Sequence, residues 1–513
     1  MTKPSIALLL LVLSLPTAQA QPGAAPFDSL FTRLHREGNF NGNVLVARHG
    51  KIIYRKSFGY ADVAAKTPNT GASRFQTAST SKIFTATAVL QLVEKGKVKL
   101  DDPVAAYLPE FPFPTVRVRH LLSHTSGLPG YELYEPLVRK HPGMLITNAV
   151  TLPALRDWQR SLYFEPGSQW KYCNTNYSLL ALLVEKVTKL SFGAYLQRYV
   201  FRPAGMQDTY VQEAGRRAAD PCLVTTHLLP TLYQTVPVNA EKIELVDTVM
   251  QWKHSFEQRS LRGTVGDHNV MSTTEDLLRF DQALYTDQLL TRQTLGLAFA
   301  PTRLNNGETY YGPEEVDYGG KTSYGLGWVV RHDPELGTIV GHDGYTGGIA
   351  TTFYRNLTRR QTVVMFDNTV GVHYREKVAS AIDLLNGKAP LALPIKKSAV
   401  RQYGEALLRQ DAEEALLYLN AMRSDTTRYY FAEREMNRLG YEFLFNDYLD
   451  QSLETFKINT LLFPASFNVY DSYGDAFARV GRREAAILMY RRAIVLNPDS
   501  EGSKQSLRKL LDE

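Results

Sequence analysis

The sequence predicts two folded units: an α+β domain with an antiparallel sheet flanked by helices and a helical subdomain, then an all-α domain. Three observations lead to this prediction. Strand-like segments occur near both ends of the first part of the chain, with mostly helical, loop-rich sequence between them. Glycine and proline residues around 386–395 separate that part from a remainder with purely helical patterning. The chain, at 513 residues, is also longer than one hydrophobic core usually supports.

Residues 1–20 are typical of a secretory signal peptide. Lys3 precedes an apolar run over residues 6–15, and a small-x-small ending at Ala20 follows. A basic start, a short apolar core and such an ending mark a cleaved leader. The run is too short to span a bilayer, which takes about 20 residues. We therefore expect cleavage near Ala20, a periplasmic or secreted location, and no membrane span.

The composition is that of a soluble globular protein, with 44% hydrophobic and 21% charged residues. The formal net charge of +6 is small for the length, and the charges are interspersed. A nucleic-acid surface normally shows a concentrated basic face, so no nucleic-acid partner is expected. Cys173 and Cys222 could form a disulfide in an oxidising compartment or remain free thiols, and the sequence does not decide between these states.

The α+β domain is expected to span residues 21–388. It opens with an amphipathic helix over residues 27–36 and a hairpin that turns at His49-Gly50. Short connections between the late strands favour antiparallel pairing, so we expect one sheet assembled from both ends of the domain. The expected strands are 43–48, 51–58, 324–330, 338–340, 349–355 and 362–367, and the closing helix is 373–385.

The all-α domain is expected to span residues 396–513, and it contains a repeat. Three positions recur 34 residues later, Gly440, Phe456 and Pro464 as Gly474, Tyr490 and Pro498. That period is typical of tetratricopeptide-like helix–turn–helix units. Each unit needs neighbours to bury its apolar face, so the repeats should pack on the α+β domain or on a capping helix. We expect this domain to offer a docking surface for a protein partner.

Ser79 and Lys82 form a Ser-x-x-Lys pair at the start of a helix predicted to be amphipathic. Residues three apart on a helix share one face, which brings the amine within reach of the hydroxyl. A serine hydroxyl is a weak nucleophile until a base removes its proton, and a partly desolvated lysine can do this. The unpaired N–H groups of the helix start would favour a developing oxyanion. The spacing alone also arises by chance in a chain of this length, so its context decides.

Further motifs follow the pair in a fixed order. They are Arg119-His120-Leu121-Leu122-Ser123-His124, Glu165-Pro166-Gly167, Tyr172-Cys173-Asn174, Gly266-Asp267, Tyr324-Gly325-Leu326-Gly327-Trp328 and His342-Asp343-Gly344. The ordered set resembles the serine β-lactamase-related hydrolases, which include class C β-lactamases, penicillin-binding proteins, D-aminopeptidases and esterases. The resemblance covers most of residues 30–370 and implies a β-lactamase/transpeptidase-like fold.

The resemblance implies a role for each matching residue. Ser79 would form the acyl-enzyme and Lys82 would help to deprotonate it. Tyr172 would share the acid–base work, as a phenolate or through a hydrogen-bond chain with Lys82. Asn174 would orient the substrate amide or Lys82. The backbone N–H groups of Ser79 and Tyr345 would form the oxyanion hole.

The third motif departs from that of many relatives, which carry a lysine where this chain has His342. A lysine is a permanent cation for a substrate carboxylate, whereas a histidine is mostly neutral near pH 7. His342 could still donate a hydrogen bond, but its hold on a carboxylate should be weaker and pH-dependent. Gly344 suits a close approach between strand backbone and substrate. Lys321-Thr322-Ser323 resembles the lysine-type motif, but it precedes Tyr324-Gly325 instead of following it, so it is rejected.

No metal or cofactor is expected. His120 and His124 have the i, i+4 spacing of metal ligands, but no third ligand is evident, so a structural role is expected. The sequence predicts an exported serine hydrolase that cleaves amide or ester bonds in a small-molecule or peptide substrate, such as D-amino-acid peptides or small esters. Two alternatives stay open, namely a β-lactamase whose main role is antibiotic hydrolysis and a non-catalytic protein that binds peptidoglycan fragments.

Overall fold

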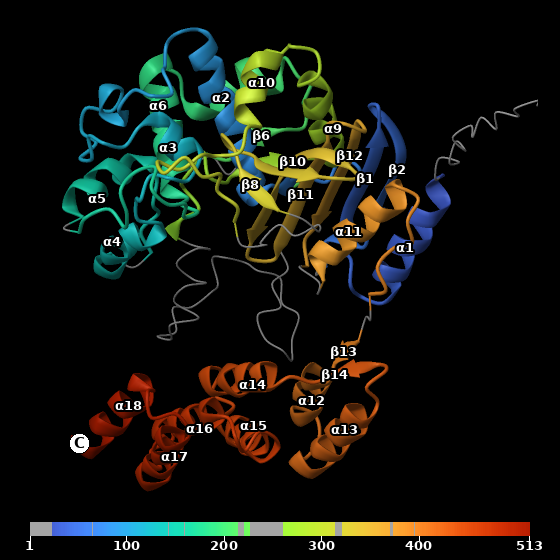
Figure 1. The fold of residues 1–513 in the computed structure, drawn as a ribbon. Helices are drawn as coiled ribbons and strands as arrows, with labels where there is room; N and C mark the ends of the chain where they lie inside the picture. Colours follow the sequence, from blue (N-terminus) through green and yellow to red (C-terminus); the bar gives the residue numbers. More distant parts are fainter. Residues whose placement is uncertain are drawn as a thin grey trace, which may run out of the picture.

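A computed structural model gives the fold of the protein (Figure 1). It describes residues 23–63, 65–141, 143–158, 160–213, 220–225, 260–312, 321–369, 373–393 and 396–512. The expected signal peptide and residues 214–219 and 226–259 lie outside the described residues.

The first part of the chain is built on a seven-stranded sheet with the order β2-β1-β12-β11-β10-β9-β8. Every neighbouring pair is antiparallel, and β1 pairs with β12, so both ends of the domain contribute to one sheet as predicted. His49 and Gly50, with φ of 50° and 73°, form the predicted two-residue turn between β1 and β2. The strands are β1 (Gly42–Arg48), β2 (Lys51–Phe58), β8 (Thr322–Tyr324), β9 (Val329–Asp333), β10 (Gly337–Thr346), β11 (Ile349–Asn356) and β12 (Gln361–Asp367).

The first part of the chain also contains five short strands and five single turns outside the large sheet, counted over its described residues. The strands are β3 (Tyr60–Asp62), β4 (Thr67–Pro68), β5 (Phe75–Gln76), β6 (Tyr210–Val211) and β7 (Val270–Ser272). The turns are η1 (Ala78–Ser81), η2 (Val104–Ala106), η3 (Tyr131–Tyr134), η4 (Asn148–Val150) and η5 (Gln197–Phe201).

Helices cover both faces of the sheet, and the strand side chains alternate between two hydrophobic cores. On β1, Val44 and Val46 pack with α1 and α11, whereas Leu45 and Ala47 belong to the core that contains α2, α6 and α9. Figure 1 shows α1 and α11 lying together against the sheet. The helices are α1 (Ala24–Arg36), α2 (Lys82–Glu94), α3 (Val118–Leu122), α4 (Glu135–Lys140), α5 (Thr151–Asp157), α6 (Thr175–Thr188), α7 (Phe192–Leu196), α9 (Thr274–Ala283), α10 (Arg292–Ala298) and α11 (Tyr374–Leu385).

The strand predicted over residues 324–330 is interrupted. β8 ends at Tyr324 and β9 begins at Val329, and Gly327 between them has a φ of 88°. A Cβ atom on Gly327 would lie 2.3 Å from Cβ of Ala86 on α2. The backbone therefore leaves the sheet here to pack directly on the helix that follows Ser79, which a side chain at residue 327 would prevent.

Helix α2 is not amphipathic, contrary to the prediction. All its residues from Lys82 to Leu92 are buried. The helix is covered because α6, α7 and the turn at Gly327 pack around it. The predicted Ser-Lys pair consequently lies at the centre of the domain, on an element that packing holds from several sides.

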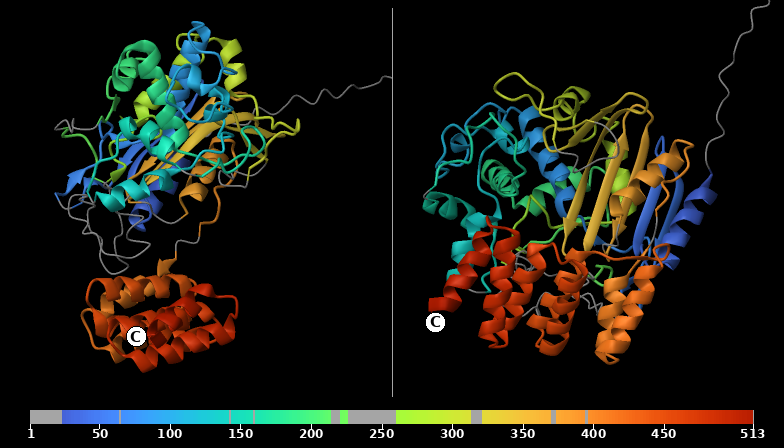
Figure 2. Two further views of the ribbon diagram at one scale, coloured as in Figure 1. Left: turned by 90° about the vertical axis from the view of Figure 1, so that its left-hand side faces the viewer. Right: turned by 60° about the horizontal axis from the view of Figure 1, so that its bottom comes forward.

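The chain after Lys396 forms a row of helices packed one on the next (Figure 2). Gly440 and Gly474 each approach an aromatic ring of the following helix, since added Cβ atoms would lie 2.6 Å from Phe456 and 2.7 Å from Tyr490. Both halves of the predicted repeat thus make the same contact, while their tetratricopeptide character stays a prediction. The helices are α12 (Ala399–Leu407), α13 (Ala412–Ser424), α14 (Glu433–Phe445), α15 (Leu449–Leu462), α16 (Phe467–Arg479), α17 (Arg483–Leu496) and α18 (Glu501–Asp512).

Two details of this unit bear on the predictions. α18 packs against α17 at the end of the row, while the packing expected of the repeats, on the α+β domain or on a capping helix, stays a prediction. The unit is not purely helical, because β13 (Lys397–Ser398) and β14 (Tyr429–Tyr430) form a short parallel pair. Among the described helices of the whole chain, none is long and apolar enough to cross a membrane.

Candidate active site

Ser79 lies in the single turn η1, between strand β5 and helix α2. The residue before it, Ala78, has a φ of 47°, a left-handed conformation that costs free energy for any residue with a side chain. Two contacts hold this strained turn: the Thr77 and Ser81 hydroxyls lie 2.9 Å apart, and Thr77 N donates to Val270 O at 2.8 Å. The turn fixes the Ser79 side chain at the N-terminal end of a buried helix.

Lys82 lies one turn beyond Ser79 and is completely buried. Its Nζ donates to Ser79 Oγ at 3.0 Å and to the backbone oxygen of Asp267 at 2.9 Å. Burial lowers the pKa of Lys82 to about 7, although the nearby charge of Asp267 opposes this effect. A large fraction of the protein therefore carries a neutral amine in hydrogen-bond reach of a serine hydroxyl near pH 7, as a general base requires.

Tyr172 covers the other side of the lysine. The centre of its ring lies 4.9 Å from Lys82 Nζ, and the His124 ring packs on it with a centroid distance of 4.3 Å. Burial holds the pKa of the Tyr172 phenol well above its ordinary value, and the neighbouring Ser79 hydroxyl offsets this only in part. The phenol is therefore neutral near pH 7. Among the described residues its buried hydroxyl has no hydrogen-bond partner in normal geometry, and the Ser79 hydroxyl is a neighbour of it.

Strand β10 runs directly against the Ser79 turn at Gly344. An added Cβ atom at this residue would lie 2.3 Å from Thr77 O and 3.0 Å from Ser79 N. Thr80 Oγ1 also donates to the backbone oxygen of His342 at 3.2 Å and so ties the strand to the turn. Only glycine permits this approach, which brings the backbone between Gly344 and Tyr345 beside the N–H of Ser79.

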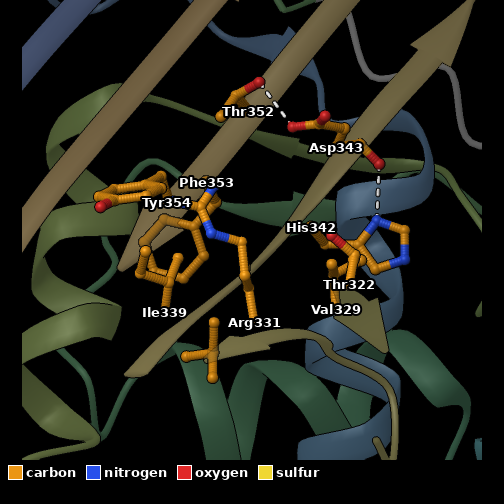
Figure 3. Close-up of a pocket in the computed structure, with 11 residues that line it drawn as sticks. Thr322, Val329, Arg331, Ile339, His342, Asp343, Thr352, Phe353 and Tyr354 are labelled. Carbon is orange, nitrogen blue, oxygen red and sulfur yellow. Dashed lines mark hydrogen bonds between the residues drawn. The ribbon is translucent and has the colours of Figure 1, made fainter. Parts of the chain in front are cut away.

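His342 is buried on the same strand, and both of its ring nitrogens are engaged. Nδ1 lies 2.6 Å from the backbone oxygen of Asp343 and must donate to it (Figure 3). Nε2 then accepts from the Tyr324 hydroxyl at 3.0 Å. Burial, helped by the charge of Lys82, lowers the pKa of His342 to about 3, so the ring is neutral. Neither nitrogen is left to hold a substrate carboxylate unless one of these bonds breaks.

A cavity of about 270 Å³ opens onto Ser79. Five of the thirteen described lining residues are tryptophan or tyrosine, and the rings of Trp170 and Tyr310 stack with centroids 4.6 Å apart. Arg375 is the only lysine or arginine among the described residues that line it. The lining residues are Ser79, Trp170, Tyr172, Tyr310, Gly312, Thr322, Ser323, Tyr324, Val329, His342, Asp343, Tyr345 and Arg375.

Asn174, predicted to bind substrate, does not line this cavity, whereas two residues of the rejected lysine-type motif do. Asn174 is absent from its lining; its backbone oxygen accepts from Tyr177 N at the start of α6, and its Oδ1 is buried with no partner among the described residues. Thr322 and Ser323, from the rejected lysine-type motif, do line the cavity. They lie on β8, which β9 separates from β10, so they are not equivalent to the motif around His342.

Asp267, part of the Gly266-Asp267 motif, is a site residue for which the sequence predicted no role. Its carboxylate is completely buried, accepts a hydrogen bond from the Tyr131 hydroxyl and lies 2.9 Å from Nδ1 of His268. Burial alone would raise its pKa, but His268, Lys82 and Tyr131 hold the pKa at about 2. Its contact with Lys82 could not be predicted, because the two residues lie 185 positions apart in the sequence.

His120 and His124 make structural hydrogen bonds, and the two cysteines are not paired. No group of three metal-ligating side chains occurs within the described part of the chain. His120 Nδ1 accepts from Arg117 N at 3.2 Å and caps α3, and His124 Nδ1 accepts from Cys173 N at 3.1 Å. Cys173 and Cys222 are both free, and burial raises the pKa of the Cys173 thiol to about 11.

Comparison with known proteins agrees with this geometry. The family described as Beta-lactamase matches residues 22–386. The chain is 36% identical over 368 residues to penicillin-binding protein 4* of Bacillus subtilis, covering 72% of this chain and 77% of that protein. The chain belongs to the β-lactamase family.

Two further proteins are similar to the chain, one over a shorter stretch and one at lower identity. Esterase EstB of Burkholderia gladioli is 36% identical over 217 residues, which cover 39% of this chain and 54% of the esterase. The crystal structure of a penicillin-binding protein from Bacillus halodurans matches with a TM-score of 0.56 and 26% identity, over 69% of this chain and 98% of that one. The β-lactamase/transpeptidase-like fold predicted from the motifs is thereby confirmed, and the family match ends before α12.

Proposed function

We propose that the protein is a serine hydrolase that cleaves amide or ester bonds through an acyl-enzyme on Ser79. The observation that carries this proposal is the 3.0 Å hydrogen bond between Lys82 Nζ and Ser79 Oγ, with the pKa of the lysine at about 7. A lysine of ordinary pKa would be charged and could not accept the serine proton near neutral pH.

The reaction follows from the positions of the groups. The neutral Lys82 amine accepts the Ser79 proton as Oγ attacks the carbonyl carbon, and the N–H groups of Ser79 and Tyr345 stabilise the oxyanion. The charged lysine and the Tyr172 hydroxyl beside it then pass a proton to the leaving amine or alcohol. Water then enters in its place and loses a proton to Lys82 as its oxygen attacks the acyl carbon. Lys82 returns that proton to Ser79 Oγ as the acyl–oxygen bond breaks, which releases the acid product and restores the free serine. The raised pKa of Tyr172 favours the hydrogen-bond chain over a phenolate.

The cavity supports D-amino-acid peptides or small esters as the substrate class. The tryptophan and tyrosine rings in the lining suit an apolar acyl group. The neutral, fully engaged His342 gives the third motif no cation for a substrate carboxylate, which leaves Arg375 as the only lysine or arginine among the described lining residues. The names of two relatives, an esterase and a penicillin-binding protein, agree with this range. We propose that antibiotic hydrolysis is not the main role, because esters and amides without a carboxylate need no cation in the third motif.

The proposal is tested with a fluorophosphonate probe and a panel of substrates. The probe should label one residue, Ser79, and the Ser79→Ala protein should show neither label nor turnover. Short esters, D-aminoacyl amides and D-alanyl-D-alanine peptides should be cleaved faster than a chromogenic cephalosporin. Equal labelling of the Ser79→Ala protein would disprove the acyl-enzyme, and a cephalosporin as the fastest substrate would instead establish a β-lactamase.

We further propose that the protein is exported and that its helical unit docks a protein partner. The sequence of residues 1–20 supports export, and the row of helices α12–α18 supports a docking surface. Cell fractionation tests the first proposal, which fails if the protein stays in the cytoplasm with its leader attached. Affinity capture with the full chain and with a chain ending at residue 388 tests the second, which fails if both retain the same partners.

A further inference from the structure

Lys82 is held both by Ser79 and by the loop that contains Asp267. The Lys82 side-chain nitrogen makes two hydrogen bonds, one to Ser79 Oγ at 3.0 Å and one to the backbone oxygen of Asp267 at 2.9 Å. The ring of Tyr172, centred 4.9 Å away, covers the amine further. The position of the base therefore depends directly on where the loop at Asp267 is anchored.

The Asp267 side chain provides that anchor. Its Oδ2 accepts from the Tyr131 hydroxyl on η3 and lies 2.9 Å from His268 Nδ1. Its Oδ1 is buried without a partner among the described residues. A buried carboxylate with one oxygen unsatisfied costs stability, so its presence beside a buried amine calls for a functional explanation.

We propose that Asp267 is a positioning residue for Lys82: its backbone oxygen fixes the amine, and its buried carboxylate supplies the counter-charge that keeps the amine basic. This inference rests on the proposed role of Lys82 as the base. Without the counter-charge, burial would make the amine a weaker base, and proton transfer from Ser79 would be less favourable.

Several groups besides Asp267 surround Lys82 and influence its pKa. Burial lowers the pKa of Lys82, whereas Asp267 raises it, followed by a smaller contribution from Cys173. The buried imidazoles of His124 and His342 also face the lysine and are neutral, because burial lowers the pKa of each. The other titratable groups around Lys82 and Asp267 in the described part of the chain are Tyr131, Tyr134, Tyr172, Tyr177 and His268.

The test is the pH dependence of kcat/KM for a neutral ester, measured on the full chain and its Asp267→Asn variant. The acid limb reports the pKa of the base in the free enzyme, and the neutral amine is the active form. Loss of the negative charge favours the neutral amine, so the limb should move to lower pH by about one unit or more. The plateau at high pH should fall, because the amine has become a weaker base.

Asp276→Asn serves as the matched control. Asp276 is also completely buried and hydrogen-bonded, accepting from Thr209 Oγ1 at 2.7 Å, but within the described part of the chain no hydrogen bond or ion pair joins it to Lys82. Its variant should lower stability without moving the acid limb. A purely structural role for Asp267 would make the two variants alike, with an unmoved limb in both, and this result would overturn the inference.

Tyr131→Phe provides a second test in case Asp267→Asn does not fold. This change removes a hydrogen bond to the Asp267 carboxylate but keeps its negative charge. Without that donor the carboxylate should attract the Lys82 ammonium more strongly and raise the pKa of Lys82, so the acid limb should move to higher pH. A limb that stays in place or moves to lower pH would contradict the inference. Failure of the proposed function looks different, because turnover would then persist in the Ser79→Ala protein whatever happens at Asp267.

Discussion

Tyr324 donates its phenolic hydrogen to Nε2 of His342, at 3.0 Å, while Nδ1 of the same ring donates to the backbone oxygen of Asp343. This pair of bonds fixes one tautomer of the imidazole. It also removes the ring from the groups that could bind an anion in the cavity. His342 is thus a structural part of the cavity wall, and the chemistry near neutral pH depends on Lys82.

We expect the acid limb of kcat/KM for a neutral ester to have its midpoint near pH 7. The pKa of Lys82 is about 7 and that of His342 is about 3, and the base must be neutral to act, so activity rises with pH through the lysine value. His342→Asn should change the rate but leave the midpoint in place. A limb that disappears in that variant would assign the titration to the histidine instead.

Arg375 should control the use of substrates that carry a carboxylate. It is the one permanent cation among the described lining residues of the cavity, and an arginine binds carboxylates in bidentate geometry. Arg375→Ala should raise KM about tenfold or more for a D-alanyl-D-alanine peptide, since a hydrogen bond to a charged group contributes about 1.5–3 kcal/mol.

The control for Arg375 is the same peptide amidated at its C-terminus. Its KM should change little in the Arg375→Ala protein, because no carboxylate remains for the guanidinium to bind. An equal rise in KM for both peptides would show that the residue shapes the cavity without recognising charge.

The sheet and the order of the site motifs could be predicted from the sequence because they depend on local patterns. Alternating strands and the His49-Gly50 turn are such patterns, whereas the break at Gly327 depends on packing against Ala86, far away in the chain. The same limit applies to the site. Asp267 meets Lys82 across 185 residues, and the neutral state of His342 results from burial, which no local pattern records.

Gly344→Ala should abolish most of the activity. The added Cβ would lie 2.3 Å from the backbone oxygen of Thr77 and 3.0 Å from Ser79 N, and neither backbone atom can move without displacing the Ser79 turn. We expect kcat/KM to fall at least about 100-fold, the usual effect of losing an oxyanion donor. Gly296→Ala on α10, where an added Cβ meets nothing within 4 Å, should keep full activity. Activity above a tenth of normal in Gly344→Ala would contradict the tight approach of β10.

Asp281→Asn should destabilise the α+β domain by about 3 kcal/mol, because it leaves a buried arginine without its counter-charge. Arg355 Nε donates to Asp281 Oδ1 at 2.5 Å, and both side chains are 1% exposed. Urea unfolding followed by tryptophan fluorescence measures this domain, since all 4 tryptophans precede residue 386.

Glu335→Gln is the control for this last prediction. The ion pair between Lys388 and Glu335 has a similar distance, 2.7 Å, but its side chains are 48% and 59% exposed. Water screens such a pair, so its loss should cost at most about 1 kcal/mol. Equal losses of unfolding free energy in the two variants would contradict the prediction. They would mean that the interior around Arg355 accommodates an unpaired charge, and that the Asp281–Arg355 pair does not hold α9 on the sheet.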